Sequence, residues 1–145
     1  MAYIASIVET DTAHRRPHPE PLATPLLEID LARELDQLRR EPEWATGQNA
    51  KTLVKHDDFR IVLTALKAHR RIPGHQTDSR LSVQTLSGHV LLRAAGRTFD
   101  LTVGRVVALD RGIVHELEAI EESAILQTIA WPATKTDRPA IASPL

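Results

Sequence analysis

The feature that most constrains this chain is a rhythm of short apolar runs between Lys51 and Trp131. Turn residues separate the runs, and single glycines interrupt them at Gly88, Gly96 and Gly104. About eight short strands at regular spacing are typical of a sandwich or barrel. We therefore predict an all-β fold with one antiparallel barrel. Its expected strands are 52–56, 59–67, 81–86, 89–93, 98–103, 106–109, 113–118 and 123–131.

Turn residues also predict two of the connections. Ser87-Gly88 separates two apolar runs, so we expect 81–86 and 89–93 to pair as a hairpin around it. The segment from His69 to Arg80 is polar and contains a Pro-Gly pair. We expect a loop there, because proline and glycine favour turns.

One helix is predicted before the strands, from Asp30 to Arg40. Asp30 can cap its first turn, and Pro42 prevents its continuation. Leucines recur at three- to four-residue spacing and form one apolar stripe, consisting of Leu27, Leu31, Leu35 and Leu38. We expect this stripe to pack on the outside of the barrel or on a partner subunit.

Composition divides the chain into four parts. Residues 1–26 are rich in proline and are expected to form an arm or linker. Residues 27–50 hold the helix and a connector, 51–131 form the barrel, and 132–145 form a loose tail. Within the arm, Tyr3–Val8 is apolar enough to pair with another subunit's sheet edge, so a homodimer is expected.

The totals exclude several classes of function. The formal net charge is −1, so there is no basic surplus to neutralise the phosphates of a nucleic acid. Cysteine is absent, which excludes disulfides and thiolate chemistry. No apolar run approaches the length of a membrane span, and no secretory signal is evident. A cytoplasmic protein that binds neither nucleic acid nor membrane is expected.

Two histidines are the candidate functional residues. His75 follows Ile72-Pro73-Gly74, and His115 follows a turn that begins at Asp110. Two facing imidazoles can bind a carboxylate, polarise a carbonyl or shuttle a proton near neutral pH. Alternatively, they remain from a lost metal site and bond to each other, to a nearby hydroxyl or to water. If strand alternation holds, the same interior is lined by Thr77, Leu81, Val83, Thr85 and Leu117.

The region 51–131 resembles the cupin superfamily. The first cupin motif has a glycine, five residues, His-x-His, then a glutamate and a later glycine. His75 matches its first histidine and Gly88 its closing glycine. Thr77 stands at the second histidine, Leu81 at the glutamate and His69 at the opening glycine.

The second cupin motif has a glycine, then proline-x-glycine, a histidine and an asparagine. Gly104, Gly112 and His115 match it, whereas Asp110 replaces the proline and Ala119 the asparagine. The resemblance implies a small jelly-roll barrel of the RmlC-like type, commonly dimeric. Its mouth is expected to bind a metal and a small molecule.

The departures from the motifs weaken the expected metal site. In metal-bearing relatives, three histidines and one glutamate hold zinc, iron, manganese or nickel. Only His75 and His115 remain here, with His69 as a conceivable third ligand. Two imidazoles leave most of the coordination shell to water or substrate, so we expect the metal to be weakly held or absent.

Three classes of function follow. The preferred hypothesis is a cupin that binds a small molecule of undetermined identity. Arg70, Arg71 and Arg80 beside His75 favour an anionic one. The alternatives are a cupin enzyme and a regulatory dimer. The enzyme is either a metal-dependent oxygenase or isomerase or a metal-free acid–base catalyst, and the dimer resembles anti-sigma cupin domains.

Overall fold

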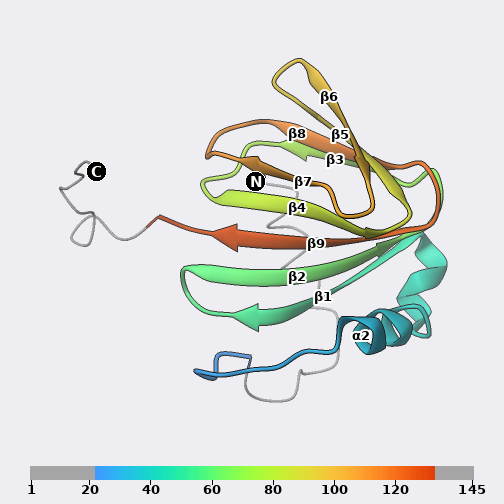
Figure 1. Ribbon diagram of the computed structural model, residues 1–145, viewed down its shortest axis with the longest axis vertical. Coiled ribbons are helices and arrows are strands. Elements are labelled where there is room, and N and C mark those ends of the chain that lie inside the picture. Colours follow the sequence, from blue (N-terminus) through green and yellow to red (C-terminus); the bar gives the residue numbers. More distant parts are fainter. Residues whose placement is uncertain (1–21, 133–145) are drawn as a thin grey trace.

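The computed structural model describes residues 22–132, which fold into two antiparallel sheets (Figure 1). The five-stranded sheet has the order β1-β2-β9-β4-β7, and the four-stranded sheet has the order β3-β8-β5-β6. The predicted all-β barrel is therefore confirmed. The strands are β1 (Gln48–Lys55), β2 (Phe59–Leu66), β3 (Arg71–His75), β4 (Arg80–Ser87), β5 (His89–Ala94), β6 (Arg97–Thr102), β7 (Val106–Leu109), β8 (His115–Ala119) and β9 (Ser123–Ala130).

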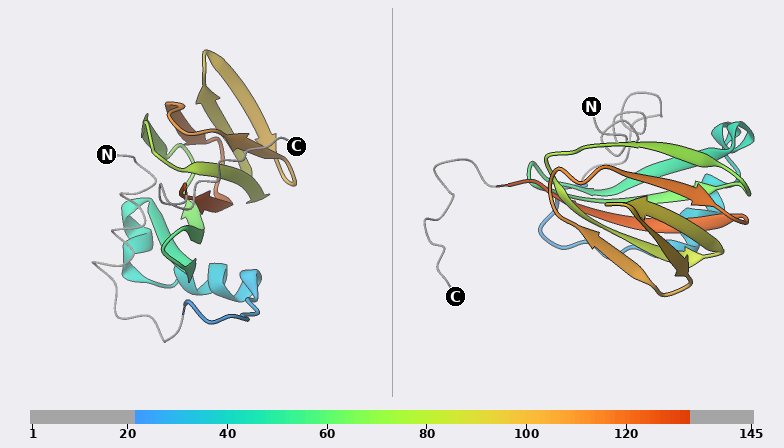
Figure 2. Two further views of the ribbon diagram at one scale, coloured as in Figure 1. Left: turned by 90° about the vertical axis from the view of Figure 1, so that its left-hand side faces the viewer. Right: turned by 90° about the horizontal axis from the view of Figure 1, so that it is seen from above.

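The core lies between the two sheets, which form two layers in Figure 2. Alternate residues of each strand point into it, because successive side chains of a strand lie on opposite faces. Val62 and Ile125 contribute from the five-stranded sheet, and Leu92 and Leu117 from the four-stranded one. We call the space between the sheets the barrel interior.

The outer face of the five-stranded sheet is covered in part by helix α2 (Leu31–Leu38), which lies beside β1 and β2 (Figure 1). Asp30 caps the helix as predicted, and its carboxylate accepts a hydrogen bond from the Arg33 backbone N–H at 3.2 Å. Leu38 is fully buried against Leu63. Leu27 is 42% exposed and does not belong to the apolar stripe, because it precedes the helix.

Pro42 stops the helix as expected. A short 3-10 helix, η1 (Pro42–Thr46), follows it, and Gly47 then leads directly into β1. The sheet thus begins at Gln48, ahead of the predicted barrel boundary at Lys51.

The predicted loop from His69 to Arg80 is wrong in its first half. Arg71–His75 forms β3, which pairs with β8 through Arg71–Glu118, Ile72–Leu117 and His75–His115. The register shifts between Ile72 and His75, where the Pro-Gly pair lies. Proline is tolerated because β3 is an edge strand, where a missing N–H breaks no inner ladder.

The predicted hairpin around Ser87-Gly88 is also wrong. β4 pairs with β7 and β9, whereas β5 pairs with β6 and β8, so the chain crosses from one sheet to the other at this point. Gly88 has φ +83°, and an added Cβ would lie 2.3 Å from the Glu122 carbonyl oxygen. Glycine therefore serves a tight crossing between sheets rather than a turn between paired strands.

The predicted exchanged strand Tyr3–Val8, the rest of the arm and nearly all of the tail lie outside the described residues. The homodimer consequently stays a prediction. Within residues 22–132, no helix has the length and apolar character needed to cross a membrane.

Candidate functional site

His115 is the first residue of β8, at the end of the barrel where β2, β4 and β8 begin and β9 ends (left side of Figure 1). We call this end the mouth. The strand alternates between buried and half-buried residues, and His115 shares the buried face with Leu117 and Ala119. Its side chain is only 1% exposed. His115 is therefore an interior residue.

A close approach between two strands fixes its position. The His75 backbone pairs with His115 on one side, and Ala94 of β5 pairs with it on the other. At Gly74 an added Cβ would lie 1.5 Å from the His115 carbonyl oxygen. Only glycine permits the β3 backbone to lie this close to β8.

The hydrogen bonding of His115 defines its chemistry. Its Nδ1 lies 3.1 Å from the Ile113 carbonyl oxygen, which can only accept, so Nδ1 carries the proton. Burial lowers the pKa of His115, and the bond to Ile113 offsets this only in part. The neutral ring thus presents Nε2 as an acceptor. This buried atom has no hydrogen-bond partner among the described residues.

A neutral His115 ring with its proton on Nδ1 can make only some of the interactions expected of two facing imidazoles. Binding a carboxylate or polarising a carbonyl requires an N–H donor, and the only donor of His115 is bound to Ile113. Accepting a hydrogen bond from a hydroxyl or an amide N–H remains open.

The other predicted pocket residues divide into apolar and polar ones. Leu81, Val83 and Leu117 belong to the apolar core between the sheets. Thr85 is also fully buried, and its Oγ1 has no hydrogen-bond partner among the described residues. Thr77 Oγ1 is 2.9 Å from Ser79 Oγ and is thereby engaged in the loop before β4.

His69 does not join the other site residues. It is exposed, has φ +70°, and its backbone N–H donates to the Ala119 carbonyl at 2.7 Å. Ala119 ends β8 and His115 begins it, so His69 lies at the opposite end of the barrel from the mouth. A third metal ligand from His69 is excluded by this distance along the strand.

Two buried polar residues that the sequence argument did not select face the same interior. Gln127 lies on β9 between Ile125 and Ile129, is fully buried, and has no hydrogen-bond partner for Oε1 or Nε2 among the described residues. Thr64 on β2 is likewise buried, and its Oγ1 has no partner in the same part of the chain. Each is spaced by two from apolar core residues, which places it on the interior face of its strand.

A pocket of about 530 Å³ opens at the mouth beside the β5–β6 turn. His115 lines it together with charged residues of the four-stranded sheet. Arg93 donates to Glu116 at 3.2 Å and to Glu118 at 3.0 Å, so its charge is already paired. The complete lining is Gly74, Arg93, Ala94, Ala95, Gly96, Arg97, Thr98, Val114, His115 and Glu116.

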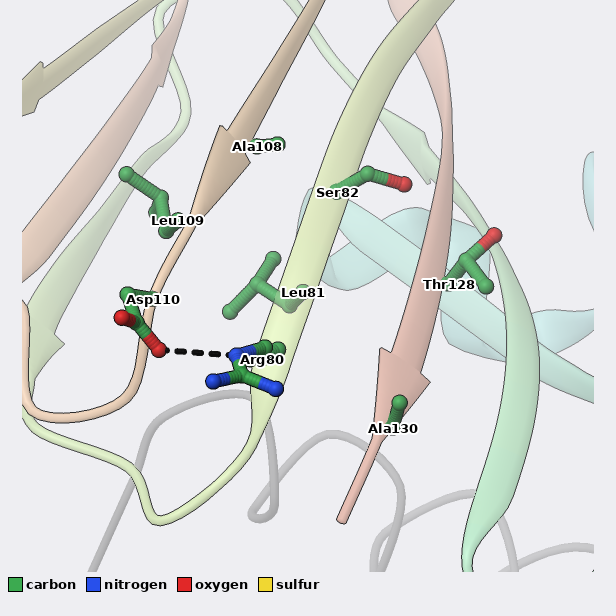
Figure 3. Close-up of a pocket in the computed structure, with 8 residues that line it drawn as sticks. All are labelled: Arg80, Leu81, Ser82, Ala108, Leu109, Asp110, Thr128 and Ala130. Atoms are coloured by element: carbon green, nitrogen blue, oxygen red, sulfur yellow. Dashed lines mark hydrogen bonds and ion pairs between the residues drawn. The ribbon is translucent and has the colours of Figure 1, made fainter. Parts of the chain in front are cut away.

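A second, smaller pocket of about 340 Å³ lies on β4, β7 and β9 (Figure 3). Its two charged residues face each other, with Arg80 Nε 2.9 Å from Asp110 Oδ1. The Arg111 backbone N–H and Arg80 hold the pKa of Asp110 below its usual range. The remaining lining residues, such as Leu81, Ala108 and Thr128, are uncharged. This pocket therefore offers no unpaired charge to a ligand.

The three arginines expected to attract an anion are engaged elsewhere. Arg71 pairs with Glu116 at 3.2 Å and Arg80 with Asp110, while Arg70 donates to Gln48 Oε1 at 2.8 Å. They do not form a free basic cluster.

Comparison with known proteins identifies the fold. No protein-family model matches the sequence, and no curated protein matches it significantly. Solved structures do match. A conserved Streptococcus pyogenes protein of unknown function has 22% identity and a TM-score of 0.62, over 81% of this chain and all of that one. The Schizosaccharomyces pombe Cnp3 cupin domain has 19% identity and a TM-score of 0.58, over 66% and 73%. The chain has a cupin fold.

An enzyme is also among the matches. Salicylate 1,2-dioxygenase from Pseudoaminobacter salicylatoxidans has 14% identity and a TM-score of 0.68. The match covers 84% of this chain but only 39% of the dioxygenase. At such identities the likeness concerns the fold alone.

The described residues do not fit the metal site of metal-bearing cupins. Leu81, at the glutamate position, is 4% exposed and belongs to the apolar core. Thr77, at the second histidine, is bonded to Ser79. The side chain of His75 lies outside the described part of the structure. Among the side chains that are described, no three histidine, cysteine, aspartate or glutamate residues form a group that could hold a metal ion.

Proposed function

We propose that this cupin binds a small organic molecule at its mouth, and that the molecule donates a hydrogen bond to His115. The observation that carries the proposal is the buried Nε2 acceptor, to which no described residue donates a hydrogen bond. A buried polar atom left unpaired costs roughly 1–3 kcal/mol. A ligand hydroxyl or amide N–H that reaches Nε2 removes this cost.

The surroundings support a small polar ligand rather than an apolar one. The adjoining pocket, about 530 Å³, lies within the size range of small-molecule sites and is lined in part by charged residues. Farther inside lies the carboxamide of Gln127, which has no hydrogen-bond partner among the described residues and can bond to a polar ligand. The hydroxyls of Thr64 and Thr85, likewise unpartnered in that part of the chain, lie nearer the opposite end of the barrel and can bond to water that accompanies the ligand.

The test is a thermal-shift screen of small hydroxylated acids, sugars and amides against wild type and His115→Asn. Asparagine can keep the donor to the Ile113 carbonyl while removing Nε2. We expect at least one compound to stabilise wild type and to lose about tenfold in affinity in the variant, the cost of one hydrogen bond. His69→Asn, at the opposite end of the barrel, is the matched control. Equal binding to wild type and His115→Asn contradicts the proposal.

A further inference from the structure

Arg60 occupies an unusual position for an arginine. It lies on β2 two residues before Val62, on the strand face that carries Val62, Thr64 and Leu66 into the interior. The alternate residues Ile61, Leu63 and Ala65 pack instead in the cluster beneath α2. Arg60 therefore points to the barrel side of the sheet, at the mouth, where β2 begins.

The guanidinium of Arg60 is held against an aromatic ring rather than a carboxylate. Its Cζ lies 4.8 Å from the centre of the Trp131 ring, which packs against the apolar core. Its Nε is buried, and within the described part of the chain Arg60 Nε has no hydrogen-bond partner and Arg60 forms no ion pair. Contact with a ring leaves the N–H donors of the guanidinium unused.

Gln127 is the nearest unpartnered polar side chain along the same sheet. Arg60 pairs with Ile129 across β2 and β9, so Gln127 and Trp131 are its two diagonal neighbours. Diagonal neighbours lie about 7–8 Å apart between backbones, within reach of long side chains. A guanidinium, an indole wall and a free carboxamide thus occur together on the interior face of the sheet.

We infer that Arg60, Trp131 and Gln127 form the subsite for the carboxylate end of the ligand, which is a small organic acid with a second polar group. The inference rests on the proposed function and specifies its ligand class. A carboxylate satisfies the guanidinium through paired N–H donors, which Arg presents in a fork. The Gln127 amide offers one donor and one acceptor to the ligand's hydroxyl or carbonyl, deeper in the barrel.

The experiment measures calorimetric affinities of benzoate, 4-hydroxybenzoate and 4-hydroxybutyrate, each beside its neutral amide. Wild type should bind one or more of the acids about tenfold more tightly than the corresponding amide. This difference corresponds to one charge-assisted hydrogen bond. Arg60→Gln is expected to remove this preference. Arg60→Lys should restore it in part, since it keeps the charge but loses the fork. Gln127→Met should lower affinity for the hydroxylated acids more than for benzoate.

The control is Arg105→Gln, which removes the same charge from an exposed residue at the opposite end of the barrel. It should leave every affinity unchanged. The inference is overturned if no acid binds wild type, if acids and amides bind equally, or if Arg60→Gln binds the acids as well as wild type does. Neutral ligands that depend on His115 but not on Arg60 would leave the proposed function standing while overturning this inference.

Discussion

Two buried carboxamides lie on opposite faces of the five-stranded sheet, and only one of them has partners within the described structure. Asn49, on the face toward α2, donates through Nδ2 to the Leu38 carbonyl and to Glu41 Oε1, each at 2.9 Å. Gln127, on the interior face, is fully buried, and no described residue bonds to either of its polar atoms. The same functional group is thus built into the structure on one face and left unpaired on the other.

The contrast extends to the residues around each carboxamide. On the α2 side, Lys51 pairs with Glu34 at 2.6 Å and Leu38 closes an apolar cluster. On the interior side, Thr64, Thr85 and His115 each carry a buried polar atom to which no described residue bonds. Buried polar groups are normally hydrogen-bonded, and a set of exceptions on one face calls for an explanation. The Asn49 carboxamide on the α2 side bonds within the protein, whereas the interior groups can bond to a ligand or to water.

The largest expected effect is a loss of folding stability on substitution of Gly74, where the β3 backbone lies against His115 of β8. Gly74→Ala should destabilise the protein by more than about 3 kcal/mol, since its Cβ would overlap the His115 carbonyl and force β3 away from β8. Gly96→Ala is the control, because Gly96 has φ +72° but no atom within 4 Å of an added Cβ. That variant should cost only the backbone strain, about 1 kcal/mol. Urea unfolding of both variants measures the two losses of stability. Equal losses would mean that β3 can move away from β8 at little cost.

The sequence predicted those parts of the fold in which one local signal dominates. Asp30 and Pro42 bound a helix whose leucines repeat at helical spacing, and glycines mark the four consecutive connections from β4 to β8. The sequence did not predict which strands a turn connects when that depends on contacts with residues far along the chain. Gly88 was expected to close a hairpin but joins two sheets, because its tight contacts come from Glu122 and Ser123 of a strand connection far along the chain.

The candidate site was predicted only in part for a related reason. Histidine draws attention by its chemistry, so His115 was found from its type and motif. Arg60 and Gln127 were missed because β2 and β9 are apolar on both faces, with α2 on one side and the core on the other. Alternation between polar and apolar residues, which would reveal the interior face, is absent from such strands.

A smaller effect tests the comparison between the carboxamides directly. Asn49→Leu should cost about 1–3 kcal/mol, because it leaves the Leu38 carbonyl and the Glu41 carboxylate without this donor. Gln127→Met should change the stability of the ligand-free protein by less than about 0.5 kcal/mol or raise it, because no hydrogen bond within the described chain is lost. Urea unfolding without ligand measures both values. If Gln127→Met costs as much as Asn49→Leu, the interior is already satisfied and the contrast is wrong.

The smallest expected effect is a pH dependence set by His115. Burial lowers its pKa in the folded state below the unfolded value of about 6.5. The unfolded chain then binds more protons, so stability should fall as pH drops through about 6.5, by at most about 1.4 kcal/mol per pH unit. Unfolding curves of wild type and His115→Asn between about pH 7.5 and pH 5.5 check this, and the variant should have the shallower slope.

The matched control for this measurement is His69→Asn, which removes an exposed histidine and should keep the wild-type slope. The same protonation of His115 should also affect the affinity for the ligand. Nε2 accepts a hydrogen bond only while the ring is neutral, so affinity that depends on His115 should not weaken until the pH falls below the folded-state pKa. Affinity that already falls near pH 6.5, in step with a free imidazole, would show that His115 is exposed to water. Nε2 of His115 would then bond to water, and the contrast between unpartnered groups on the interior side and bonded groups on the α2 side would no longer hold for this residue.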